Sequence, residues 1–569
     1  MILKALYDYY QKKQDVLPAF GKELKEIGFL LVITRDGEFL RFEDRRIDSK
    51  SASSFLVKKH VGRSSGVAPN YLYDNSSYVF CYSNKGDLES CRKYFDAFKA
   101  KIEEIFLRHP ENQGIKAIHK FYTKSPEEIL ARLQQDPLWE EIVKNLNKKY
   151  STFSFLLEGD TKIIAEQDEL LDLMTTSDRT DERICLISGE KGACVETTTA
   201  TMIPGSQATA KLVAFQVNSG YDSYGKEKCE NAPISEISEF AYTTALNHLL
   251  AVDSRNKFLI GNRTFLFWSS SACDVGRQME EGLFTLFGFK DDSTDPDRGI
   301  EKVKKVFTSV YSGLLSISKD DRFFILGLAP NIARISVVYW SELPLKEFAA
   351  ILLRHFDDMD MVDNRKDRKP YIGLHAMLSA VTLGGKSSEA TPNLPEAVAR
   401  SIFQGLPYPD TLFAECIRRI RAEQNVYVTR ASIIKAYLNR KFNNIKPITS
   451  MLDKENTNQG YLCGRLFATL VKIQEAGSGI DSIRERFMNA ASATPSAVFS
   501  TLMNLSIHQQ DKLNKGQQVF YEKLISEILS KFDANGFPAH LNLQDQGRFF
   551  VGYYHQRQDF FTKQENNNE

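Results

Sequence analysis

The sequence predicts an α+β protein, with a mixed strand-and-helix N-terminal body over residues 1–383 and an all-α helical bundle over residues 393–569. Strand-type alternation and helix-type spacing are interspersed in the first half, whereas nearly every segment of the second half has helical spacing. Residues 383–392 between them are rich in Gly, Ser and Pro, as is typical of a linker. A chain of 569 residues also exceeds what one core usually serves, so we expect two or more domains.

The N-terminal body is expected to begin with an amphipathic helix over residues 2–10 and a hairpin with an Asp-Gly turn between strands 29–33 and 38–42. Apolar spacing predicts a helical block over residues 87–148. Further strands are expected at 153–157, 184–187, 211–217 and 264–268, and as a pair at 322–328 and 333–340. In the bundle, helices are expected at 431–442, 460–476, 480–490, 493–513 and 516–532.

Composition narrows the class of protein. Hydrophobic residues make up 42% of the chain and charged residues 26%, as in ordinary globular proteins. The N-terminus carries charges too early for a signal peptide and no run of about 18 apolar residues occurs, so we expect a cytoplasmic protein without membrane contact. Eight cysteines without a C-x-x-C pair predict reduced, mostly buried thiols rather than a disulfide framework or a metal site. We also expect no cofactor.

The charge balance gives no global signal for nucleic acid. Lysine plus arginine equals aspartate plus glutamate, 73 against 73, so a nucleic-acid partner would have to contact local patches. Three segments are candidates for such contact.

The first candidate is a polar loop between the strand expected at 211–217 and a helix that starts near Ser235. It offers amides and hydroxyls for hydrogen bonds, rings for stacking and ammonium groups for phosphate. Its candidate residues are Asn218, Ser219, Tyr221, Tyr224, Lys226 and Asn231. The helix should bury Ile237, Phe240, Ala241 and Ala245 on one face. The alternative is a solvated connection whose two tyrosines pack on the strand.

The second candidate is the segment 54–72, where cations stand beside small polar residues. Glycine and serine let backbone N–H groups approach phosphate, while lysine and arginine release counterions from it. The candidate residues are Lys58, Lys59, Arg63, Ser64, Ser65 and Asn70. A surface loop without a ligand is the alternative.

The third candidate is the stretch 416–446, with eight basic residues against one acid, Glu423. Such a surplus creates a local field able to hold a nucleic-acid backbone. The candidates are Arg418, Arg419, Arg421, Arg430, Lys435, Arg440 and Lys441. Some should pair with acids elsewhere in the bundle, so about half are expected to touch phosphate.

An acidic run with a histidine is the place where a metal-dependent nuclease or RNA-processing site could lie. It consists of His355, Asp357, Asp358, Asp360 and Asp363. At helical spacing only His355 and Asp358 share a face, and no glycine follows Asp360 as a calcium loop requires. We therefore favour a solvated helix end and assign no catalytic residue, with the enzyme as the alternative.

Several strings resemble a known family, and together they span nearly the whole chain. They are MILKALYDYY at the start, CLISGEK at 185–191, NSGYDSYGKEKCENAPISE from 218, FFILGLAPNIARISVVYW at 323–340, FQGLPYPDTLFAECIRRIRAEQ at 403–424, GRLFATLVKIQEA at 464–476, ASATPSAVFSTLM at 491–503 and GRFFVGYYHQRQDFF near the end. In these strings the sequence resembles the large subunit of the subtype I-C (Dvulg-type) CRISPR surveillance complex, Cascade.

The resemblance implies a non-catalytic, nucleic-acid-binding subunit of an antiviral complex. Such a subunit lies near the 5′ end of the guide RNA, recognises the protospacer-adjacent motif in duplex DNA and promotes R-loop formation. Its implied partners are the guide RNA, the target duplex with its displaced strand, the Cascade backbone and small subunits, and a separate helicase-nuclease. The resemblance favours segment 54–72 as the first candidate for motif contact and the 218–231 loop as the second. It favours the bundle as the part that binds the displaced strand.

The resemblance also implies that the bundle is made separately, from an internal translation start, as the small subunit. Met451 precedes the helix expected at 460, and a product beginning there would have 119 residues, enough for a compact bundle. The alternative is an ordinary loop methionine.

A third class of function is a scaffold whose polar loops bind only other subunits.

Overall fold

The computed structural model of the protein describes residues 1–61, 66–84, 88–171, 182–215, 222–260, 262–270, 274–287, 296–315, 317–365, 372–442 and 446–561. The chain folds into two compact units. Unit 1 holds residues 3–199 and 214–248, and unit 2 holds residues 200–213 and 249–569. The expected class is confirmed, because sheets and helices in the first part are followed by a run of packed helices. The boundary expected at 383–393 stays a prediction.

Unit 1 is built on a four-stranded sheet of order β3-β2-β6-β5. The expected hairpin is present as β2 (Phe29–Ile33) and β3 (Phe39–Asp44), and β6 (Phe153–Leu157) pairs parallel to β2. All residues of β2 and β6 are buried, as apolar central strands covered on both faces should be. The short β5 (Tyr73–Asp74) completes the sheet.

The helical block expected at 87–148 is confirmed beside this sheet. Phe95, Phe98, Ile102 and Ile105 form the buried face of its long helix and belong to the same core as the strands. The helices are α2 (Ser76–Phe80), α3 (Leu88–Arg108), α4 (Gln113–Phe121), α5 (Pro126–Leu133) and α6 (Trp139–Asn145).

The remaining elements of this part of the chain are short apart from two helices. They are α1 (Ile2–Lys12), β1 (Lys22–Glu26), β4 (Ser54–Lys58), η1 (Ile164–Glu166), α7 (Asp168–Leu171), β7 (Glu182–Ile184), β8 (Lys191–Ala193), η2 (Ser223–Gly225), η3 (Lys228–Asn231) and α8 (Glu236–Leu250). The predicted helix near Ser235 is thus present as α8. Its residues Phe240, Ala241 and Ala245 are buried, but Ile237 is 55% exposed, so its place on the apolar face was wrong.

Two expected strands are not formed as predicted. The strand expected at 184–187 occurs as β7 and ends at Ile184, because Leu186 N–H turns to the carbonyl of Pro233. In the strand expected at 211–217, Lys211 makes a single bridge to Arg334 and the described residues that follow, up to Phe215, join no ladder. Alternation alone does not supply the neighbouring strand that a ladder needs. Residues 216 and 217 lie outside the described residues.

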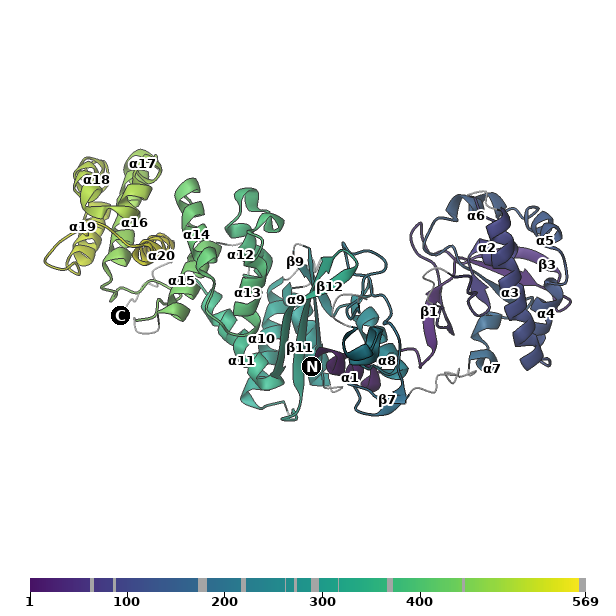
Figure 1. Ribbon diagram of the computed structural model, residues 1–569. Helices are drawn as coiled ribbons and strands as arrows, with labels where there is room; N and C mark the ends of the chain where they lie inside the picture. Colours follow the sequence, from purple (N-terminus) through teal and green to yellow (C-terminus); the bar gives the residue numbers. More distant parts are fainter. Residues whose placement is uncertain are drawn as a thin grey trace. The chain divides into compact units, whose positions relative to one another are not determined.

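Unit 2 begins with an antiparallel sheet of order β12-β11-β10-β9 (Figure 1). Its strands are β9 (Lys257–Ile260), β10 (Arg263–Ser269), β11 (Arg322–Asn331) and β12 (Arg334–Pro344), and its helices are α9 (Asp274–Phe287), α10 (Pro296–Ser312) and α11 (Leu345–Met359). The strand at 264–268 and the pair at 322–340 are confirmed. Phe323 of β11 stacks on Phe348 of α11 with ring centres 4.4 Å apart, which fixes helix to sheet.

Helices make up the rest of unit 2, and the five predicted ones are confirmed. They are α12 (Leu374–Ala380), α13 (Leu394–Phe403), α14 (Asp410–Glu423), α15 (Val428–Lys441), α16 (Gln459–Ser478), α17 (Ser482–Ala493), α18 (Pro495–Gln510), α19 (Lys515–Leu529) and α20 (Leu543–Asp559), with the 3-10 turns η4 (Leu383–Gly385) and η5 (Ser387–Glu389) in the expected linker. One hydrophobic core runs from Phe258 in the sheet to Tyr554 in α20.

Helices α16 and α20 pack with their backbones in close approach. A Cβ added to Gly464 would overlap the Phe549 carbonyl oxygen and lie 2.8 Å from the Tyr553 nitrogen. Small residues at such a crossing let two helices approach closely enough to bury most of their facing surfaces. Gly464 is therefore required by packing rather than by backbone conformation.

The described cysteines are all free, and all except the half-buried Cys194 are buried, as predicted. No helix among the described residues combines the length and the apolar character needed to cross a membrane.

Candidate nucleic-acid interface

The loop before α8 presents an aromatic ring to solvent. Tyr224 is 95% exposed and has φ of 61°, a left-handed conformation that is uncommon for residues other than glycine. Lys226, two residues on, is also exposed. The alternative in which this tyrosine packs on a strand is therefore wrong. The structure offers Tyr224 and Lys226 for stacking and for phosphate contact.

Internal contacts hold this loop in shape. The Asn231 amide donates to the Ser223 carbonyl over 3.0 Å, and the Lys228 ammonium pairs with Glu196. Asn231 thus braces the loop, whereas the sequence had suggested it as a ligand. Asn218, Ser219 and Tyr221 lie outside the described residues.

Segment 54–72 places its two lysines against aromatic rings. Lys58 Nζ lies 4.7 Å from the ring centre of Tyr71, and Lys59 Nζ lies 5.1 Å from that of Phe240 and 3.5 Å from a Glu239 oxygen. The side-chain amide oxygen of Asn70 accepts a hydrogen bond from the backbone N–H of Val61, so this side chain shapes the loop. Arg63, Ser64 and Ser65 lie outside the described residues.

Three cations of the basic stretch 416–446 are buried structural groups. Their relative exposures are 2% for Arg430, 4% for Lys435 and 4% for Arg440. Arg430 pairs with Glu423 at 2.6 Å, and the Lys435 ammonium donates to the Asp357 carbonyl over 3.0 Å. Groups so placed cannot reach a phosphate without unfolding their surroundings, so they do not form part of a surface for nucleic acid.

Most of the other cations of this stretch are at the surface, whereas the Arg419 side chain is only 12% exposed. Arg421 is exposed, while Arg418, Arg419 and Lys441 pair with Glu415, Glu423 and Asp410 respectively. The expected mixture of internally paired and exposed cations is present on α14 and α15.

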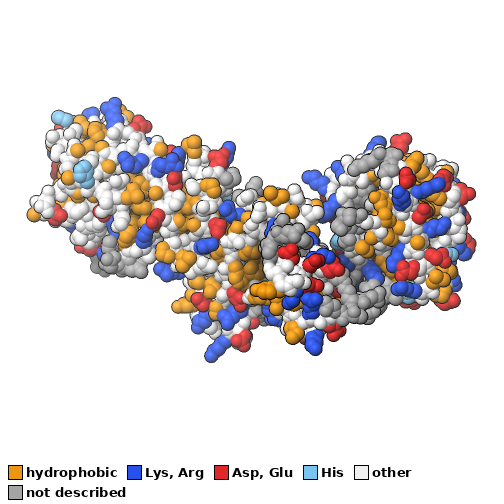
Figure 2. All heavy atoms as spheres, viewed as in Figure 1, with side chains coloured by type: hydrophobic (Ala, Val, Ile, Leu, Met, Phe, Trp, Pro, Cys, Tyr) orange, Lys and Arg blue, Asp and Glu red, His pale blue; other side chains and the backbone are white. Residues whose placement is uncertain are grey.

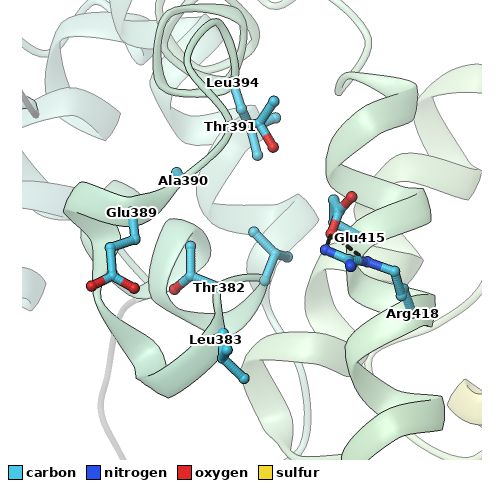
Figure 3. A pocket seen from close by; sticks show the side chains of 9 residues that line it. Thr382, Leu383, Glu389, Ala390, Thr391, Leu394, Glu415 and Arg418 are labelled. Carbon is cyan, nitrogen blue, oxygen red and sulfur yellow. Dashed lines mark hydrogen bonds and ion pairs between the residues drawn. The ribbon is translucent and has the colours of Figure 1, made fainter.

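Arg418 lies at a small cavity of 160 Å³. Figure 3 shows Arg418 and Glu415 on α14, joined by hydrogen bonds, on one side of this cavity, with Thr382 and Leu383 on the other. The arginine is 69% exposed, so a phosphate in solvent can compete with its surface ion pair.

The acidic run does not assemble a metal site. His355 is buried and its Nδ1 lies 2.7 Å from the Tyr408 hydroxyl, while Asp358 accepts a hydrogen bond from Arg440. Asp363 pairs with Arg365. In the described part of the chain, no three His, Cys, Asp or Glu residues come together as metal ligands. The preferred interpretation of a solvated helix end was also incomplete, because His355 and Asp358 serve the core.

One group of cations was missed by the sequence reasoning. Lys101 and Arg108 of α3 both pair with Glu104, at 2.7 and 2.8 Å, and their charges act on Lys58. Their i, i+3 and i+7 spacing on one helix face was a signal, but their proximity to Lys58 depends on long-range packing.

Figure 2 shows lysine and arginine interspersed with aspartate and glutamate over the face in view, in keeping with the neutral net charge. The fold and these sites define a large protein of mixed α/β and helical parts whose exposed cations form separate local groups. The chain belongs to the CRISPR-associated protein family Cas_Csd1, whose model matches residues 6–561. This is the family of the large subunit of type I-C Cascade. None of the curated proteins matches the chain.

Proposed function

We propose that this protein recognises the protospacer-adjacent motif in duplex DNA, promotes R-loop formation and recruits the helicase-nuclease. Family membership over nearly the full chain is the observation that carries the proposal. In an RNA-guided complex, base pairing reads the long target, and a protein subunit needs to read only a short duplex motif and to hold the opened strands. The guide RNA and the Cascade backbone and small subunits are the other partners of this proposal.

Motif contact is assigned to unit 1. Tyr224 and Lys226 are supported by their exposure, and Lys58 and Lys59 by their place on segment 54–72. The displaced strand is assigned to the exposed cations of α14 and α15, which attract a backbone without reading bases. Proposed residues outside the described part of the chain are Arg63, Ser64, Ser65, Asn218, Ser219 and Tyr221.

Substitution of the exposed tyrosine tests the assignment. In the guide-loaded complex, Tyr224→Ala should weaken binding to a duplex with the matched motif about 5- to 100-fold, the effect of losing one base–aromatic stack. Tyr311→Ala is the matched control, because Tyr311 is 52% exposed on α10. An equal loss of affinity for duplexes with the matched and the scrambled motif would show that this loop does not read the motif.

A second proposal concerns the C-terminal bundle, which we infer is also made separately from Met451. This residue is 62% exposed in the connection before α16, so the start would precede helices α16–α20 without cutting any of them. The close α16–α20 crossing lies wholly within the shorter product. Met488 is fully buried inside α17, and a start there would remove α16 from that crossing.

A further inference from the structure

Two cations of α3 pair with one carboxylate in unit 1, and all three of these charges act on Lys58. Lys101 Nζ lies 2.7 Å and Arg108 Nη2 lies 2.8 Å from the two oxygens of Glu104. Lys58, at the end of β4, interacts with all three of these charges. The group therefore carries three positive charges against one negative charge, drawn from β4 and α3.

The fifth member of the group is a tyrosine whose hydroxyl has no described partner. The ring of Tyr71 lies under Lys58, and its residue is 8% exposed. The hydroxyl oxygen is buried and makes no hydrogen bond to any described residue. Buried hydroxyls are nearly always paired, so this one can donate to a group that enters the site. Burial raises the pKa of Tyr71 to about 12, so its hydroxyl keeps a proton to donate.

The electrostatics of the group favour an added anion. The pKa of Lys58 is lowered by burial first, and then by the positive charges of Lys101 and Arg108. Repulsion among like charges disfavours the protonated form, and an anion between them would remove this penalty. Two ammonium groups, one guanidinium and one hydroxyl offer several charge-assisted hydrogen bonds to a phosphate, with a planar fork that matches two of its oxygens.

We propose that Lys58, Tyr71, Lys101 and Arg108 bind one phosphate of a nucleic-acid backbone, which displaces Glu104. This inference deepens the proposed function and rests on it for the identity of the ligand. Glu104 can give way because its two pairs are at the surface, where such pairs contribute at most about 1 kcal/mol each. Lys101 and Arg108 are 34% and 62% exposed, so the phosphate can enter from solvent.

A double variant on α3 tests the site against a matched control. Lys101→Gln with Arg108→Gln should weaken binding of the full-length chain to nucleic acid about tenfold and lower the salt slope by about one. The control is Arg92→Gln with Lys93→Gln, which removes the same charge from the same helix, again from residues paired with glutamates. Equal losses in the two double variants would overturn the proposal.

Two single variants test the geometry rather than the charge. Tyr71→Phe keeps the ring under Lys58 and removes only the hydroxyl, and it should weaken binding about fivefold. Glu104→Gln removes the competing carboxylate, and it should strengthen binding about two- to fivefold. A structural role for Glu104 would give the opposite sign, so weaker binding by this variant contradicts the proposal.

The probes are a short RNA oligonucleotide and a short DNA duplex, titrated separately. A loss confined to one of them assigns the phosphate to that polymer, a loss with both assigns it to the backbone in general, and a loss with neither overturns the site. Motif discrimination is measured in the guide-loaded complex. If the unaltered complex does not discriminate, the proposed function fails while the salt slope of the isolated chain still reports on the site.

Discussion

The guanidinium of Arg440 donates to the carboxylate of Asp358 over 2.5 Å, with the two side chains 1% and 12% exposed. The same guanidinium donates to the carbonyls of Ser401 and Leu406, each at 2.7 Å, and lies over the ring of Tyr408. It therefore ties α15 to α11, to α13 and to the connection after α13. Two groups that the sequence offered for phosphate and for metal instead stabilise the core.

Loss of one partner from this pair should be costly. Arg440→Ala leaves Asp358 buried without its counter-charge, and we expect unit 2 to lose about 3–5 kcal/mol of stability. Urea denaturation followed by circular dichroism measures the loss. Arg418→Ala is the control, because it breaks an exposed pair worth about 1 kcal/mol or less. Similar shifts of the midpoint for both variants would contradict the account.

Two buried histidines should make the protein sensitive to mild acid. Burial, reinforced by nearby positive charge, lowers the pKa of His355 and of His555 to about 3. An unfolded histidine has a pKa of about 6.5, so below that pH the unfolded state binds more protons and stability falls as the pH falls. Each histidine should cost about 2 kcal/mol between about pH 7.5 and pH 5.

Denaturation at these two pH values measures the effect. His555→Gln should make stability less dependent on pH in this window, whereas His540→Gln, at an exposed position, should not. An unchanged pH dependence in His555→Gln would show that this histidine titrates normally in the folded protein.

The close packing of α16 and α20 predicts a large loss of stability when one methyl group is added at Gly464. Gly464→Ala places a Cβ against the backbone of α20, and we expect a loss of about 3 kcal/mol, at the upper end for overpacking. Gly516→Ala on α19 meets nothing nearer than 3.4 Å and should stabilise the helix by about 0.5–1 kcal/mol. Thermal melting compares the two variants, and a neutral Gly464→Ala would contradict the close packing.

Removal of the internal start should remove one product and leave the other. With a C-terminal tag, cells expressing the gene should show the full chain and a shorter product by immunoblot. Met451→Leu removes the proposed start codon and should therefore abolish the shorter product. The full chain should persist, because Met451 is exposed and leucine is tolerated there. Met488→Leu should leave both products. Persistence of the shorter product in Met451→Leu would place the start elsewhere or assign the product to proteolysis.

The sequence predicted elements whose signals are local. The Asp-Gly turn before β3, the helical block of α3–α6 and the helices α15–α19 each depend on spacing within one segment, and all are present. The strand expected at 211–217 was wrong for its described residues because a strand requires a distant partner.

The roles of side chains likewise depended on contacts between elements that are distant in sequence. A count of charges could not show that Arg430, Lys435 and Arg440 are buried, since their partners lie on other elements. It also could not bring Lys58 next to Lys101, because the two are separated in sequence by β5, α2 and the first half of α3. Exposure, as for Tyr224, was likewise a property of the folded chain.

We propose above all that this subunit confers recognition of the flanking motif on the guide-loaded complex. The most direct measurement is the affinity of that complex, assembled with and without this chain, for duplex targets with a matched or a scrambled motif at fixed salt. We predict that high affinity requires both this chain and the matched motif. If the chain raises affinity equally for both duplexes, motif reading lies in another subunit and the claim is contradicted.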